Sequence, residues 1–166
     1  MIRIMLDSDN LAALPAGVAP LLATYSDLFR TAAHIQAFEH AHPGSQLVLI
    51  DRGLGDPTGM ASVIDIETGA FGVGSVLPWM EQKEAEHIAD PTTYVSRSSM
   101  AAVDAALAGT RFANHWQWIA RLDGYWQIPP YRPFRRPAAV QIAPADMTGI
   151  DADGSLVYSD AWHRAA

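Results

Sequence analysis

The sequence predicts an α/β fold: a reduced or irregular (β/α) TIM-like barrel of mostly parallel strands with some crossover helices missing. Strand-like and helix-like segments alternate along the chain, and the strand segments are apolar on both faces, as in sheets that helices cover. An acidic or polar residue follows the last apolar position of most of these strands. This pattern is typical of a barrel whose functional rim lies at the carboxyl ends of its strands.

The first half of the chain contains four predicted strands and one predicted helix. The polar residues 7–10 follow the first strand and are suited to cap a short helix. The predicted helix, residues 31–40, has apolar positions at helical spacing and stops at Pro43. The link 52–60 is shorter than the ~10–12 residues of a helical crossover, so we expect a bare loop there. The strands are expected over residues 2–6, 20–25, 46–50 and 61–67.

The second half repeats the alternation. Helices are expected over residues 75–88, with Pro78 tolerated in the first turn, and over residues 98–108, closed by Gly109. An aromatic and Pro-rich loop is expected over residues 125–137. No internal repeat or linker is visible, so residues 1–166 are expected to form one barrel domain, which is shorter than the ~200 residues of a complete barrel. The strands are expected over residues 92–95, 116–121, 138–142 and 155–158.

Composition excludes several classes of function. The formal net charge of −7 argues against a nucleic-acid partner, which needs clustered Lys and Arg, and the one basic run, residues 132–136, is short and broken by Pro133. The chain has no cysteine, which excludes disulfides and thiolate–metal sites. The N-terminus lacks the apolar core of a signal peptide, and the longest apolar stretch, residues 11–23, is broken by Pro and Gly. We therefore expect neither a signal peptide nor a transmembrane segment, and no membrane partner.

Motifs of several other enzyme and ligand-binding classes do not occur in the sequence. None of the six histidines forms the HExxH pair of a zinc site, and neither a P-loop nor the GxSxG of serine hydrolases is present. Residues 151–155, with Asp151 and Asp153, resemble the start of a calcium loop. Trp162 stands at the twelfth position, where that loop needs Glu, so a tight turn is expected instead. We therefore expect no metal and no other cofactor.

Residues 61–69 contain the strongest functional signal. Asp65 and Glu67 are two positions apart near the carboxyl end of a predicted strand, so their side chains point to the same side. Two acids within a few Å disfavour each other's ionisation, and one of them is expected to hold a proton near neutrality. Glycosidic bond cleavage needs a protonated acid beside an ionised one. The structural alternative is that Asp65 caps a turn and Glu67 is a solvated surface residue.

Aromatic residues are concentrated late in the chain. Sugar rings present apolar C–H faces that stack on aromatic planes, so a glycan groove would use such residues. The alternative is that the two Trp residues on the predicted strand pack the core and the others pin the following loop. Six aromatic residues lie within twenty positions: Trp116, Trp118, Tyr125, Trp126, Tyr131 and Phe134.

Several segments resemble, in their order, glycoside hydrolase family 25, the lysozyme-type muramidases. The chain is even more similar to the small, divergent glycoside-hydrolase-like domains that actinobacteria and their phages encode. The strongest matching pieces are the strand 63–67 and the PTTYVSRS segment 91–98, and weaker ones are Asp7, residues 118–121 and residues 139–141. The resemblance implies a modified (β/α) barrel with its active site at the carboxyl rim of the strands.

The resemblance also implies roles for individual residues. Glu67 would be the general acid that protonates the leaving oxygen. Asp65 would assist the reacting acetamido group or stabilise the cationic transition state. Asp7 and Asp151 would complete the acidic cluster, although Asp153 competes with Asp151 for that position. The chain departs from the muramidases after Gln141, where Ile142 replaces the usual Tyr. Four residues are candidates for substrate binding: Tyr25, Tyr94, Trp118 and Gln141.

Two functions follow as expectations. The first is a peptidoglycan-directed glycosidase of the muramidase type, with bacterial cell-wall glycan as its partner. The second is a non-catalytic module that keeps the barrel without turnover, either a phage tail-associated protein bound to other virion proteins or a cell-wall-binding module. Either suits a protein of the phage virion, or of the host cytoplasm before release. We expect Asp7, Asp65 and Glu67 in one cleft, at the ends of neighbouring parallel strands, and a raised pKa for Glu67.

Overall fold

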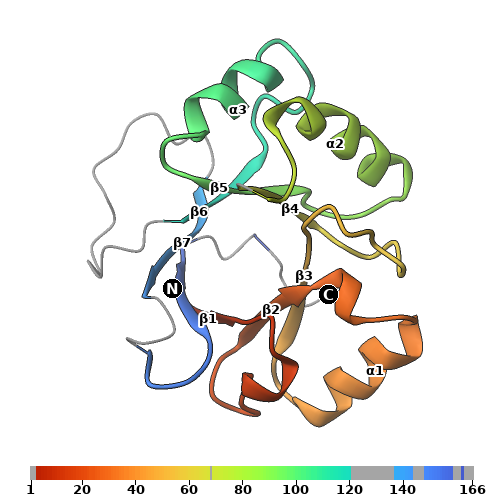
Figure 1. The fold of residues 1–166 in the computed structure, drawn as a ribbon, viewed down its shortest axis with the longest axis vertical. Helices are drawn as coiled ribbons and strands as arrows, with labels where there is room; N and C mark the ends of the chain where they lie inside the picture. The colour runs from red at the N-terminus through yellow and green to blue at the C-terminus, as the bar shows by residue number, and fades with distance from the viewer. Residues whose placement is uncertain (1–2, 68, 121–136, 144–147, 159–161, 163–166) are drawn as a thin grey trace.

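The computed structural model describes residues 3–67, 69–120, 137–143, 148–158 and 162. Their strands form one closed barrel, β1 to β8, in which each strand pairs with its neighbours in chain order (Figure 1). Strands β1 to β7 pair in parallel along the chain, whereas β8 is antiparallel to both β1 and β7. The predicted barrel of mostly parallel strands with few helices is therefore confirmed.

The first half of the barrel follows the predicted order. The side chain of Asn10 accepts a hydrogen bond from the Ala12 amide, so the polar residues after β1 cap a short 3₁₀ helix, as expected. Thr31 caps α1 in the same way, by accepting from the amide of His34. The elements are β1 (Arg3–Asp7), η1 (Leu11–Ala13), β2 (Leu21–Tyr25), η2 (Ser26–Leu28), α1 (Ala32–Ala41), β3 (Gln46–Asp51) and β4 (Val63–Ile66).

In the second half, both helices are shorter than predicted and the last strand begins two residues earlier. Gly109 has φ 76° directly after the end of α3, a backbone conformation that glycine adopts without strain. Residues 121–136, which include most of the predicted aromatic loop and the basic run, lie outside the described residues. The elements are η3 (Val73–Ser75), α2 (Val76–Ala85), β5 (Thr92–Ser96), α3 (Met100–Leu107), β6 (Trp116–Ala120), β7 (Pro137–Ala143) and β8 (Asp153–Val157).

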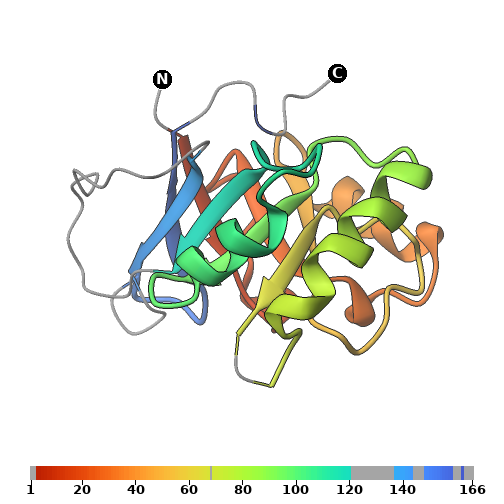
Figure 2. The ribbon, with the colours of Figure 1, turned by 90° about the horizontal axis from the view of Figure 1, so that it is seen from above.

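The helices cover only part of the barrel. Helices α2 and α3 lie side by side over β4 and β5, and α1 lies over β2 and β3 (Figures 1 and 2). No described α-helix joins β3 to β4, so the predicted bare loop between these strands is confirmed. Among the described helices, none combines the length and apolar character needed to cross a bilayer.

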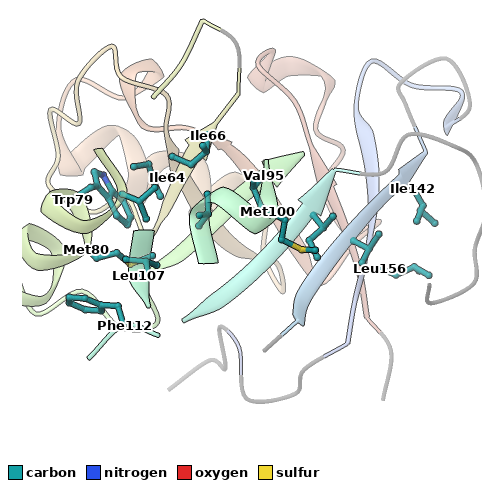
Figure 3. Close-up of a cluster of buried hydrophobic side chains, with 14 residues drawn as sticks. Ile64, Ile66, Trp79, Met80, Val95, Met100, Leu107, Phe112, Ile142 and Leu156 are labelled. Carbon is teal, nitrogen blue, oxygen red and sulfur yellow. The ribbon is translucent and has the colours of Figure 1, made fainter. Parts of the chain in front are cut away.

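Strand alternation divides the apolar side chains between two compartments. Inward-facing residues such as Met5, Val63 and Trp118 fill the barrel interior together with Trp162, whose indole donates a hydrogen bond of 2.8 Å to Thr92 Oγ1. Thr92 begins β5, so Trp162 closes the amino end of the barrel. Outward-facing residues pack beneath α2 and α3; Figure 3 shows this second cluster, which includes Ile64, Val95, Val103, Leu107 and Ile119. The carboxyl end of the barrel holds polar side chains instead.

Candidate functional site

Four carboxylates lie at the carboxyl end of the parallel strands. Asp7 is the last residue of β1, Asp65 lies near the end of β4, and Glu67 follows β4 directly. Asp153 is the first residue of β8 and pairs with Asp7 across the ladder. Because β8 runs antiparallel, its first residue lies at the rim where β1 ends. These acids occupy the same strand parity as the inward-facing Met5, Val63 and Val157, so they continue the interior stack to the rim.

The structure brings the three predicted acids to one rim, but β1 and β4 are not neighbouring strands as expected. Strands β2 and β3 lie between them, so β1 and β4 are on different sides of the barrel (Figure 1). Closure of the sheet sets Asp7 and Glu67 across the interior from one another. Their charges interact there, because Glu67 is one of the causes that raise the pKa of Asp7.

The acid pair on β4 has one buried member and one exposed member. Asp65 is 5% exposed, and burial, followed by the charge of Glu67, raises its pKa to about 7, while the charge of Arg52 opposes the rise. Glu67 is exposed; desolvation by the adjacent protein, followed by the charge of Asp153, raises its pKa. The pKa of Glu67 is therefore raised, as predicted, but Asp65 is the member of the pair whose pKa lies near neutral pH.

Asp7 is a second acid of the rim with a buried carboxyl group. Its pKa is raised well above the ordinary value by burial, then by the charge of Asp153, then by that of Glu67. Asp7 Oδ1 is buried without a hydrogen-bond partner, and so is Asp65 Oδ1. A buried carboxylate oxygen without a donor is costly when charged, so both positions favour the protonated acid.

Gln141 links the acids to the aromatic floor of the site. Its amide nitrogen donates to Asp153 Oδ2 and, at 3.5 Å, to Asp7 Oδ2, while its amide oxygen accepts from the hydroxyl of Tyr94. Gln141 is 1% exposed and Trp118 is fully buried, with its indole donating to Ser155 Oγ at 3.1 Å. Three of the four candidate substrate-binding residues, Tyr94, Trp118 and Gln141, are therefore buried inside the barrel rather than on an open surface.

Tyr25 is the candidate that faces an open hollow. It ends β2, is partly exposed, and is covered by the guanidinium of Arg52 at 4.2 Å from the ring centre. Asp27 accepts two hydrogen bonds from Arg52, at 3.0 and 2.8 Å, and so holds the guanidinium over the ring. The sequence interpretation did not include Arg52, although its position directly after the β3 strand is the same as that of the rim acids.

Of the two candidates for the remaining position in the acidic cluster, Asp153 faces the barrel interior and Asp151 does not. Asp151 is exposed and accepts a hydrogen bond of 3.1 Å from the side chain of Asn10, outside the ring of inward-facing acids. Asp153 takes the inward position and contributes to the raised pKa values of Asp7 and Glu67. Asp151 still lines the rim, because it borders the same hollow as Asp7.

Three adjoining hollows run across the rim. The first has a volume of about 260 Å³ and is lined by residues including Asp7, Tyr25, Arg52, Asp151 and Asp153. The second, of about 340 Å³, shares Tyr25 and Arg52 with the first and adds Asp65 and Glu67. The third, of about 520 Å³, shares Glu67 with the second and extends toward the serines that follow β5. We refer to the three hollows together as the groove, and Glu67 borders two of them.

Two other polar side chains of the barrel, Asp51 and His115, have partners away from the groove. Asp51, at the end of β3, has the opposite parity and accepts a hydrogen bond of 3.0 Å from the indole of Trp79 beneath α2. His115 is buried between Thr93 Oγ1 and the Phe112 carbonyl. Among the described residues, no group of three or more His, Cys, Asp or Glu side chains is arranged to hold a metal ion.

Comparisons of the chain with protein-family models, curated proteins and solved structures give no match. The chemistry of the rim is therefore inferred from its own geometry. That geometry combines a buried acid that titrates near neutrality, an exposed acid two residues away, and an elongated polar groove in which the exposed acid stands between two hollows.

Proposed function

We propose that the protein is a glycoside hydrolase of the muramidase type, directed at the glycan of bacterial cell walls. The observation that carries the proposal is the pair Asp65 and Glu67 on one face of β4, one buried with a pKa of about 7 and one exposed in the groove. Glycosidic bond cleavage requires two carboxyl groups of unequal protonation flanking the scissile bond. An elongated groove across the rim suits a chain-like substrate better than a compact one.

Glu67 is the member of the pair that can reach a bound glycan, because it is exposed and lies where two hollows meet. It donates its proton to the leaving oxygen as the bond from that oxygen to the anomeric carbon breaks. Water then supplies a hydroxyl group to the anomeric carbon and returns its proton to the acid pair. The raised pKa of both members keeps a proton on the pair near neutrality for this transfer.

Asp65 lies two residues before Glu67 on the same side of the strand. When it is ionised it stabilises the positive charge that develops on the sugar ring, and when it is protonated it can hold the acetamido group of an N-acetylated sugar. Asp153, whose charge contributes to the raised pKa values of Asp7 and Glu67, adds negative potential to the same rim, which favours a cationic transition state over a neutral ground state. Gln141 holds Asp153 in place through its amide nitrogen. Together these residues stabilise positive charge on a sugar bound in the groove.

The test is the release of reducing ends from peptidoglycan of several bacterial wall types by the purified protein. Glu67→Gln keeps the shape of the side chain but cannot donate a proton, so release should fall by about 10²–10⁴-fold. Asp65→Asn should also lower release strongly. His34→Ala, on the exposed surface of α1, is the matched control and should leave release unchanged.

The alternative function gives a different result in the same assay. A protein that releases no reducing ends from any wall type, yet sediments with the wall, is a cell-wall-binding module. One that instead assembles into a particle with tail proteins is a virion component. Either result contradicts the hydrolase proposal and leaves the barrel and its rim as described.

A further inference from the structure

The third hollow of the groove has a lining unlike that of the other two. It is bordered by Glu67, by Phe71 on the β4–η3 loop, and by three serines, of which Ser96 ends β5 and Ser98 and Ser99 follow it. Its volume of about 520 Å³ lies within the range of ~300–1,000 Å³ that is typical of small-molecule sites. Of the four rim carboxylates, Glu67 alone borders it, and Asp7, Asp65 and Asp153 do not.

Three serine hydroxyls meet at one side of this hollow. Ser96 Oγ lies 3.0 Å from Ser98 Oγ and donates to Ser99 Oγ at 3.1 Å. Each hydroxyl has one proton and two lone pairs, so two bonds among three hydroxyls leave one O–H donor and several lone pairs for a ligand. Ser98 is exposed and the other two are partly exposed. The cluster therefore offers both donors and acceptors, which is what sugar hydroxyl and acetamido groups require.

Phe71 adds an aromatic surface to the same hollow. Its ring is partly buried against the apolar cluster under α2 and α3, and its amide donates to the Asp65 carbonyl at 3.1 Å. That backbone bond ties the Phe71 loop to the strand that carries the acid pair. An aromatic ring beside clustered hydroxyls can take the apolar C–H face of a pyranose while the hydroxyls bind its polar substituents.

The position of Glu67 assigns the hollow a place in the reaction. Glu67 borders both this hollow and the one that contains Asp65, so a glycosidic oxygen protonated by Glu67 lies where the two meet. The sugar that develops positive charge then lies over Asp65, and the sugar that departs lies over the serines. We infer that the third hollow binds the leaving-group sugar, an N-acetylated pyranose; this assignment rests on the proposed hydrolase function.

Two substrates that differ only in their leaving group test the assignment. One is a peptidoglycan tetrasaccharide, and the other is the aryl glycoside of the corresponding disaccharide, which places no sugar over the serines. Replacing two hydroxyls, in Ser98→Ala/Ser99→Ala, should lower kcat/KM for the tetrasaccharide by about tenfold. The aryl glycoside should be hydrolysed as by the unmodified protein. Ser75→Ala is the matched control, because Ser75 makes no capping side-chain bond and does not border the hollow.

A second variant guards against a folding defect in the double variant. Ser98→Phe, at the exposed member of the cluster, fills the hollow and should also impair hydrolysis of the tetrasaccharide alone. Equal losses on both substrates, or no loss on either, would overturn the leaving-group assignment while leaving the hydrolase proposal intact.

Binding without turnover separates the two proposals further. N-acetylglucosamine added to the labelled Glu67→Gln variant should shift the NMR signals of Phe71 and of residues 96–99, and Ser98→Ala/Ser99→Ala should remove these shifts. If neither substrate is cleaved by the unmodified protein but the shifts occur, the hydrolase proposal and the leaving-group role fall, and the hollow is a sugar-binding site only. If the substrates are cleaved and no shift occurs, the sugar site falls alone.

Discussion

The inward position of Asp65 on β4 determines its burial and therefore its pKa. Alternation along β4 turns Asp65 into the barrel, where it is 5% exposed and its Oδ1 has no hydrogen-bond donor. Burial disfavours the charged form, and the pKa rises to about 7. A carboxyl group in this state costs stability whenever it ionises, so the site opposes the stability of the fold at neutral and alkaline pH.

Replacing Asp65 with Asn should therefore stabilise the protein, and only at high pH. The native protein holds the Asp65 proton more tightly than the unfolded chain does between pH 3.8 and about 7. The stability that this proton contributes is complete below about pH 4 and is lost as the pH rises through 7. Asn cannot ionise, so at pH 8 the free energy of unfolding should rise by a few kcal/mol, on the order of 1.4 kcal/mol for each unit by which the folded and unfolded pKa values differ.

Urea unfolding of both proteins at pH 4 and at pH 8 measures this effect. The two should have similar stability at pH 4, because Asp65 is then protonated in the folded state. A variant that gains nothing at pH 8 would show that Asp65 is hydrated and ordinary. Such a result would also remove the proton near neutrality on which the proposed chemistry depends.

For single residues, the sequence correctly predicts which acids face the barrel interior only where the predicted strand includes the residues next to them. The i, i+2 spacing of Asp65 and Glu67 is sufficient, because the small and β-branched residues before them predict a strand. In the sequence, Asp151 and Asp153 compete for one acidic position that the family resemblance implies, and the last strand is expected to begin only at residue 155. Beginning it at 153 gives Asp153 the parity of Ser155 and Val157 and turns it inward. Arg52 could not be placed at all, because its position over Tyr25 depends on a partner, Asp27, on the separate element η2.

At the scale of the elements, the β3–β4 loop is held by contacts with α2. Chain length predicts the loop without a helix, but not what holds it. Asp56 in the loop accepts hydrogen bonds from the Ala61 amide at 2.8 Å and from Lys83 Nζ at 2.9 Å. Lys83, on α2, has a side chain only 1% exposed and also pairs with Glu86 at 2.7 Å. This contact between loop and helix depends on tertiary packing, which no local pattern encodes.

Lys83→Met should destabilise the protein by about 3–5 kcal/mol, because it leaves the buried Asp56 carboxylate without its cation. The lowered pKa of Asp56, which Lys83 maintains against the cost of burial, should rise in the same variant. Glu84→Gln is the matched control on the same helix. It breaks an ion pair with Arg111 in which both side chains are more than half exposed, and should cost less than about 1 kcal/mol.

Chemical denaturation of the two variants compares these costs directly. Equal small losses would contradict a structural role for the Lys83–Asp56 contact. A large loss confined to Lys83→Met would show that a buried ion pair fixes the loop from which Arg52 and Leu54 border the groove.

At the scale of the whole molecule, the elements that close and cover the barrel are distinct from the residues of the candidate site at its carboxyl end. Helices lie over β2 to β5, while β8 returns antiparallel between β7 and β1 and completes the ring. That direction could have been predicted, because the residues between β7 and β8, 144–152, are too few for the crossover that a parallel strand needs. The closure of the amino end by Trp162 could not have been predicted, because Trp162 follows the last strand in a stretch of sequence that has neither strand nor helix periodicity.

Trp162→Ala should lower the free energy of unfolding by about 3–5 kcal/mol, because it empties a fully buried volume beside Trp118 and removes the bond to Thr92. Trp162→Phe keeps most of the volume and should lose about 1 kcal/mol, chiefly from the hydrogen bond. Thermal unfolding followed by tryptophan fluorescence and circular dichroism measures both.

The same variants test whether the two ends of the barrel are independent. Trp162 lies at the amino end and the acids lie at the carboxyl end, so hydrolysis per folded molecule should be unchanged in Trp162→Phe. The edge-to-face ring contacts from Trp162 through Trp118 to Tyr94, with ring centres 6.4 and 4.8 Å apart, are the physical route by which a change could reach Gln141 and the acids. A folded Trp162→Phe protein with altered activity would show that these aromatic contacts position the rim, and would contradict the independence of the two ends.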